Sequence, residues 1–274
     1  AYDYIRLGHP LSCILEWVIA SFNNLNPESV ISFSSKTVPV LAILRKNLFE
    51  KKNTQILYAG ELPGFFDAEI LRDVYGYQFE LTKVESSSAI PDFNGSTIFI
   101  SQQDEMNSFD LAPNIDFFIG LHSHLGSILL VNGEQNEIYI SEIQHVRRRE
   151  TIAMTPVNSL DAIKLLIDKT SVHTTKSDIE GDIASVLNSI KAITGSNTKA
   201  LVASSGLSMQ YAIMMGLIHD AQENHKGKAI KFIVPPNCYG GTNDQARRVA
   251  ACLDNVEVVD LPVDGDNEMV QSID

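Results

Sequence analysis

The residues best suited to chemistry lie in two short turns between positions 203 and 243. The first, Ser204-Ser205-Gly206-Leu207, is built of small residues and directly precedes an apolar run with helical spacing. A turn that opens a helix presents free backbone N–H groups and the positive end of the helix dipole, which bind anions such as phosphate. The second turn, Tyr239-Gly240-Gly241-Thr242, follows an apolar, strand-like segment at 230–234. Ligands of open α/β sheets bind near strand ends, so the two turns together indicate a flat, phosphorylated cofactor.

In this order, and with a helix between them, the two turns resemble those of the Cys/Met-metabolism family of pyridoxal 5'-phosphate (PLP) enzymes. This fold-type I family includes the cystathionine γ-synthases, the cystathionine lyases and the methionine γ-lyases. Each turn alone is typical of an ordinary loop; together they match the start of the family's phosphate-binding helix and its ring-stacking tyrosine. The resemblance implies that Ser205, Gly206 and Leu207 bind the PLP phosphate and that Tyr239 lies over the pyridine ring.

A third segment, near the start of the chain, resembles the same family. Residues 4–10, Tyr-Ile-Arg-Leu-Gly-His-Pro, are similar to the family's Tyr-x-Arg-x-Gly-x-Pro segment. In family dimers this tyrosine and arginine reach the cofactor phosphate of the neighbouring subunit. The resemblance therefore implies that Tyr4 and Arg6 bind the cofactor and that the protein is a homo-oligomer. Arginine suits phosphate because its planar fork donates two hydrogen bonds at once.

The chain shows the same order of predicted elements twice, with Ser34-Ser35 and Ser204-Ser205 at equivalent points about 170 residues apart. Each copy reads helix, strand, Ser-Ser turn, helix. The first copy has Lys36 where the second has Gly206, and a lysine side chain there blocks close approach to the backbone. We therefore expect a degenerate PLP-transferase-like module at 1–170 and the N-terminal part of a better preserved module at 171–274. The alternative is a chance repeat, because helix-strand-helix units are common in α/β folds.

The segment 120–127, which contains His122 and His124, resembles the family's Gly-Gly-His-Ser-Asp segment after the Schiff-base lysine. Phe117 stands where that lysine belongs, so the first copy is expected to be non-catalytic. The simpler interpretation of the two histidines is a pair at the end of a strand, or a weak metal site that needs further ligands. We expect no metal to be bound.

Strand-like segments at 30–33, 54–58, 97–101, 200–203 and 230–234 alternate with helical patterns along the chain. This alternation predicts an α/β fold with a mostly parallel sheet and helices on both faces. The family resemblance refines this to the three-layer αβα fold of PLP-dependent transferases, duplicated and incomplete.

Composition limits the partners and the compartment. The chain has 274 residues and a net charge of −13, which argues against nucleic acid and anionic membranes as partners. It contains no run of 18 apolar residues and no signal-peptide pattern. Three cysteines without paired spacing suggest reduced thiols and a cytoplasmic location.

The leading functional hypothesis is a PLP-dependent lyase or γ-replacement enzyme of sulfur amino-acid metabolism, acting on a small amino acid. No lysine follows Lys231, so the Schiff-base lysine of the second copy is not in this chain, and we expect the chain to be part of a longer polypeptide. Two alternatives remain open. A non-catalytic regulatory partner of the family predicts no PLP binding at all. An unrelated phospholigand-binding α/β module predicts a different phosphorylated ligand.

Overall fold

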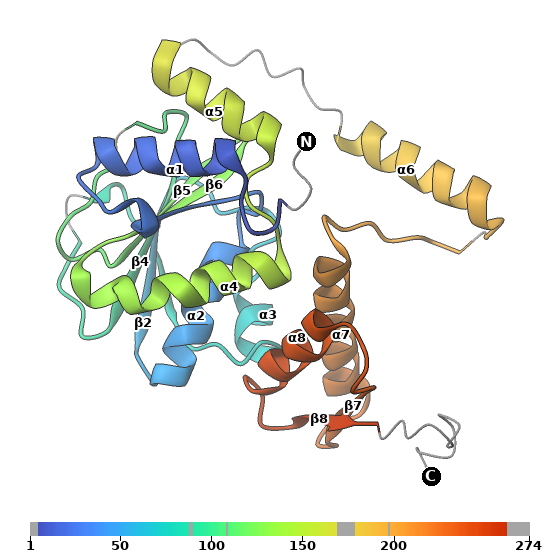
Figure 1. Cartoon of the computed structure of the whole chain (residues 1–274). Helices are drawn as coiled ribbons and strands as arrows, with labels where there is room; N and C mark the ends of the chain where they lie inside the picture. Colours follow the sequence, from blue (N-terminus) through green and yellow to red (C-terminus); the bar gives the residue numbers. More distant parts are fainter. Residues whose placement is uncertain (1–4, 88–89, 108, 169–178, 197, 262–274) are drawn as a thin grey trace.

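The structure is a computed structural model that describes residues 5–87, 90–107, 109–168, 179–196 and 198–261. Most of its strands form one six-stranded sheet with helices on both sides, and the later part of the chain packs against one of these helical layers (Figure 1). In chain order the elements are α1 (Pro10–Phe22), η1 (Pro27–Ser29), β1 (Val30–Phe33), α2 (Val38–Glu50), β2 (Thr54–Ala59), α3 (Ala68–Asp73), β3 (Glu80–Lys83), β4 (Ser96–Gln102), β5 (Phe117–His122), β6 (Gly126–Val131), η3 (Glu134–Tyr139), α4 (Ile140–Glu150), α5 (Pro156–Asp168), α6 (Ile179–Thr194), α7 (Gly206–Asn224), β7 (Ile230–Val234), α8 (Gly240–Ala250) and β8 (Val256–Asp260).

The six-stranded sheet has the order β1-β6-β5-β4-β2-β3. Strands β2, β3, β4 and β5 pair in parallel, whereas β6 is antiparallel to both of its neighbours, β5 and β1. Only residues 123–125 connect β5 to β6, and a connection this short forces the chain to reverse direction. Five strands therefore run one way, which confirms the predicted mostly parallel α/β sheet.

Both faces of this sheet are buried under helices. Along β5, Phe117 and Ile119 join one apolar cluster, which includes residues of α2, α3 and α4. Phe118, between them, belongs to a second cluster on the opposite face, together with Leu15 and Ile19 of α1 and Ala162 of α5. Continuous burial of successive residues is what a sheet covered on both sides requires. The layers are helix, sheet, helix, with α1 and α5 on one side (Figure 1).

Local polar contacts set where α1 begins. The His9 side chain accepts a hydrogen bond from the backbone N–H of Ser12, and Pro10 occupies the first helical turn, where it is favoured. The other ring nitrogen of His9 lies 2.7 Å from the Met154 carbonyl oxygen. One histidine thus caps α1 and ties it to the segment that leads into α5.

The later part of the chain forms a smaller sheet in which β7 and β8 pair in parallel. The order α6, α7, β7, α8, β8 repeats the order α1, α2, β2, α3, β3 of the first part, and β2 and β3 also pair in parallel. The strand predicted at 200–203 is wrong, because these residues form no strand and Leu201 is 68% exposed. A strand needs a hydrogen-bonded neighbour, and the described residues offer this segment none.

The second part packs directly on the first. Tyr211 and Met215 of α7 and Val249 of α8 are buried in the same apolar cluster as α2 and α4. The module boundary predicted at 170/171 falls among residues 169–178, outside the described residues, so the two-module division stays a prediction. Within the described ranges, no helix combines the length and the apolar character needed to cross a bilayer.

Candidate anion-binding site

The first predicted turn lies at the N-terminus of α7 and is open. Ser205 is the N-cap residue, with an extended backbone, and its Oγ accepts a hydrogen bond of 3.1 Å from the backbone N–H of Ser208. The backbone N–H groups of Gly206 and Leu207 have no hydrogen-bond acceptor among the described residues. A Cβ atom built on Gly206 would meet nothing within 4 Å. The turn therefore offers two free donors, the helix dipole and room for a ligand atom close to the backbone.

The second turn, at the N-terminus of α8, lies beside the first. A Cβ atom built on Gly241 would be 2.5 Å from Tyr239 Cε1, 2.8 Å from Arg149 Nη1 and 3.0 Å from Leu207 Cδ1. Three side chains from different elements thus converge on a position where only glycine leaves them room. The N–H groups of Gly240 and Gly241 also lack an acceptor within the described part of the chain. Two helix N-termini therefore open onto the same region.

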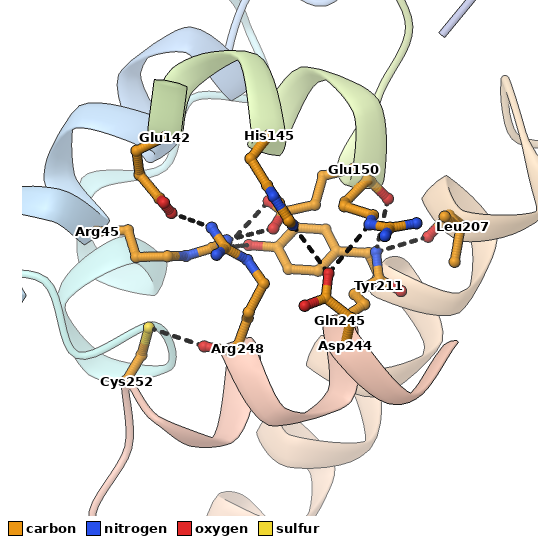
Figure 2. Close-up of polar contacts among 11 residues, drawn as sticks. Arg45, Glu142, His145, Glu150, Leu207, Tyr211, Asp244, Gln245, Arg248 and Cys252 are labelled. Carbon is orange, nitrogen blue, oxygen red and sulfur yellow. Dashed lines mark hydrogen bonds and ion pairs between the residues drawn. The ribbon is translucent and has the colours of Figure 1, made fainter. Parts of the chain in front are cut away.

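A buried glutamine holds the two turns together (Figure 2). The side chain of Gln245, on α8, is fully buried, and its Nε2 donates to the carbonyl oxygens of Leu207 (3.0 Å) and Arg149 (2.9 Å). Gln210 of α7 adds a second link, since its Nε2 donates to the Thr242 carbonyl oxygen at 3.0 Å. These bonds fix the start of α7, the start of α8 and the end of α4 relative to one another.

The segment near the start of the chain reaches this region. Arg6 Nη2 donates a hydrogen bond of 3.3 Å to the Tyr239 hydroxyl, across 233 positions of sequence. Tyr239 is itself 57% exposed. Of the six candidate residues, Ser205, Gly206, Leu207, Tyr239 and Arg6 are described and belong to this arrangement. Tyr4 lies outside the described residues.

Charged side chains of α4 and α8 pair between the two helices (Figure 2). The Asp244 carboxylate lies 3.0 Å from Arg149 Nε and 2.9 Å from His145 Nε2. Partial burial would raise the pKa of Asp244, but the hydrogen bond to His145 and the charges of His145, Arg149 and Arg248 together lower it. Asp244 therefore stays ionised and orients Arg149, whose Nη1 faces Gly241.

Sequence reasoning missed Arg149, Asp244 and Gln245. Arg149 ends a run of three arginines in the last turn of α4, a pattern that is typical of a helix C-terminus and gives no hint of a site. Asp244 and Gln245 lie two and three positions after the Tyr-Gly-Gly-Thr turn, so their place in the first turns of α8 was the one available signal.

The equivalent turn of the first copy is closed. Lys36 Nζ donates a hydrogen bond of 2.7 Å to the Ser123 carbonyl oxygen, and partial burial lowers the pKa of Lys36. Ser35 Oγ accepts hydrogen bonds from the N–H groups of Thr37 and Val38. The Lys36 ammonium group thus lies against the loop after β5.

The two histidines stand at the end of β5. His122 Nδ1 accepts hydrogen bonds from the backbone N–H groups of His124 (3.1 Å) and Leu125 (3.3 Å), and burial lowers the pKa of His122. This is a structural role in the β5–β6 turn. Over the described ranges, no group of three or more His, Cys, Asp or Glu side chains is placed to hold a metal ion.

Compared with models of known protein families and with curated proteins, the chain has no match.

Proposed function

We propose that this chain binds PLP at the α7–α8 site and carries out its function as part of a PLP-dependent lyase or γ-replacement enzyme of sulfur amino-acid metabolism. One observation carries the proposal: the 3.3 Å contact between Arg6 and Tyr239. It joins two segments that each resemble a cofactor-binding segment of the Cys/Met-metabolism family. An unrelated α/β module would have no reason to bring these two segments together.

The residues present suit the cofactor. The free N–H groups of Gly206 and Leu207 and the open space at Gly206 suit a phosphate group. Arg6 adds a guanidinium group near the Tyr239 ring, which offers a flat apolar face to a pyridine ring. When bound, PLP acts as an electron sink during bond cleavage in an amino acid. In this chain, the residues of the α7–α8 site bind and orient that cofactor.

The first part of the chain is, in this proposal, a degenerate copy that serves the second. It contributes Arg6 and Arg149 to the α7–α8 site, whereas Lys36 fills its own equivalent turn. The same family resemblance leads us to propose that the fold is a duplicated, incomplete transferase-like fold. It also leads us to propose an amino acid as the substrate. The three cysteines are free, in keeping with the cytoplasmic location that we propose.

Stacking on Tyr239 gives the first test. Tyr239→Ala should weaken PLP binding by ~1–3 kcal/mol, by analogy with the stacking of bases on aromatic side chains, whereas Tyr239→Phe should retain most of the affinity. Calorimetric titration of the chain with PLP measures both. Phe65→Ala is a matched control, because Phe65 is an exposed aromatic residue in another loop. Equal PLP affinity for the wild type and Tyr239→Ala would reject stacking, and tighter binding of AMP than of PLP would favour the phospholigand-module alternative.

Gly241 gives the second test, with its neighbour as control. In Gly241→Ala the new methyl group should displace the Tyr239 ring and the Arg149 guanidinium, since both lie within 3 Å of its position. These are the ends of flexible side chains, so the fold should survive while PLP affinity falls roughly tenfold or more. Gly240→Ala should bind PLP like the wild type, because nothing lies within 4 Å of a Cβ atom there. The same affinity for both variants would contradict the proposed placement of the ligand.

A further inference from the structure

Helix α1 presents an uncharged face to solvent. The only charged residue of the helix is Glu16, and its carboxylate points inward, 2.7 Å from Arg147 Nη1 and 2.6 Å from the Ser32 hydroxyl. Trp17, the only tryptophan of the chain, is 58% exposed on the outer side. The exposed residues of α1 are Pro10, Cys13, Ile14, Trp17, Ser21 and Phe22. A surface helix normally carries its charged residues on this side.

Helix α5 extends the same surface. It packs beside α1 over the same face of the sheet (Figure 1). Among the described side chains of α5, those of residues 156–167, the exposed ones are Val157, Leu160, Lys164 and Ile167, and Lys164 lies 3.1 Å from Asp161. We call the set Ile14, Trp17, Phe22, Val157, Leu160 and Ile167 the α1–α5 surface.

The α1–α5 surface differs in charge from the exposed side of α7. The chain has a net charge of −13, so two copies repel each other over most of their surfaces. On α7, the exposed apolar residues Ile213 and Leu217 share the exposed side of the helix with Asp220 and Glu223. A contact between two copies of this acidic chain costs least where no carboxylates oppose each other, and α1 provides such a face.

We propose that the α1–α5 surface is the contact between two copies of this chain in a symmetric dimer. A twofold contact places the same patch of both copies face to face, so the patch must be complementary to itself. An uncharged apolar face meets this need because it does not require positive groups to lie opposite negative ones. Loss of charged residues and enrichment in aromatic residues mark the cores of protein interfaces. Among the described side chains of this face, a charged partner would find only the ion pair between Lys164 and Asp161.

The size of the surface suits this partner. Six large apolar side chains, each exposed by about half its area, present on the order of 600 Å² per copy, near the ~800 Å² that each partner contributes to a standard interface. An apolar patch of that size is at the upper end for a monomer and is often functional. The proposal is independent of PLP binding, because the α1–α5 surface lies on the opposite side of the sheet from the helices that pack against α7 and α8.

Sedimentation velocity over a range of protein concentrations tests the dimer. The wild type should shift from monomer to dimer as concentration rises, and the emission of Trp17 should move to shorter wavelength over the same range. Trp17→Glu and, separately, Leu160→Glu should raise the dimer Kd by at least ~30-fold, as expected for residues at the centre of an interface. Both positions are exposed, so circular dichroism should show an unchanged fold.

Two control variants make the test specific. Phe65→Glu introduces the same charge at a residue that is 69% exposed in the loop before α3, and it should leave the dimer intact. Leu217→Glu introduces the same charge on α7, and it should also leave the dimer intact. A wild type that stays monomeric at every soluble concentration would overturn the proposal. So would a dimer that survives both Trp17→Glu and Leu160→Glu, or one that Leu217→Glu alone dissociates.

Discussion

Replacing Arg45 by alanine should lower the free energy of unfolding by about 3–5 kcal/mol, the usual cost of leaving a buried charge without its partner. Arg45, on α2, is 1% exposed, and the Glu150 side chain at the end of α4 is fully buried. The guanidinium group contacts both carboxylate oxygens of Glu150, with Nη2 at 3.0 Å from Oε2, and Nη2 also donates to the Tyr211 hydroxyl of α7 at 3.4 Å (Figure 2). Burial alone would lower the pKa of Arg45, but the charge of Glu150 raises it, so Arg45 stays charged.

Equilibrium unfolding in urea measures the loss, and two further variants assign its cause. Lys46→Ala changes the next residue of the same helix, whose ion pair with Glu50 is exposed, and it should leave the unfolding midpoint nearly unchanged. The double variant Arg45→Met, Glu150→Leu should recover much of the stability, because apolar residues of similar size often replace a buried ion pair at little cost. A double variant as unstable as Arg45→Ala would show that the lost packing, and not the unpaired carboxylate, dominates.

The burial of the Arg45–Glu150 pair could not be predicted from the sequence. Arg45 lies within an apolar helical pattern and Glu150 ends a run of arginines, so both look like ordinary surface charges. Their burial depends on α7 and α8 packing over α2 and α4, and Tyr211 of α7 lies 166 positions after Arg45. Local patterns carry no information about such a contact, because hydrophobic periodicity describes one element at a time.

The main sheet, by contrast, was largely predictable. The apolar runs at 30–33, 54–58 and 97–101 form β1, β2 and β4 within a residue or two of the expected bounds. Each is a short apolar run that both layers of helices cover, and such runs are recognisable without tertiary information. The run at 200–203 has the same character, but among the described residues no strand pairs with it, and Leu201 and Val202 are exposed. Strand propensity alone therefore does not decide whether such a run forms a strand. A neighbouring strand with which it can pair is also needed.

The candidate site was predictable to the extent that its chemistry is local. A helix start with free N–H groups and a turn with one aromatic residue can each be recognised from four consecutive residues. Arg149 and Gln245 could not be recognised, because their roles come from α4 and α8 meeting at Gly241. The Arg6–Tyr239 contact is an intermediate case, since the family resemblance implied that both residues bind the cofactor but not that they contact each other.

Treatment of the chain with PLP and then borohydride should fix no stoichiometric label on any lysine. Covalent attachment of PLP needs an amine that is largely unprotonated and placed at the aldehyde of the bound cofactor. Lys36 has a lowered pKa and is the most reactive candidate, but its Nζ donates to the Ser123 carbonyl oxygen in the first copy's closed turn. Lys226 and Lys228 are exposed in the turn before β7, and Lys231 lies 3.5 Å from Glu257.

Peptide mapping by mass spectrometry after reduction reads this out directly, and Lys36→Arg provides the matched control. The wild type and Lys36→Arg should show the same low background of labelling spread over several exposed lysines, while PLP still binds reversibly to both. One PLP per chain, fixed on Lys36 and lost in Lys36→Arg, would mean that the first copy is the catalytic one. A single label on Lys231 would instead place an amine of the second copy within reach of the cofactor. Either result would refute the assignment of the chain's lysines to non-catalytic positions, whereas uniform background labelling with retained PLP binding supports a site that holds the cofactor through Gly206, Leu207 and Tyr239.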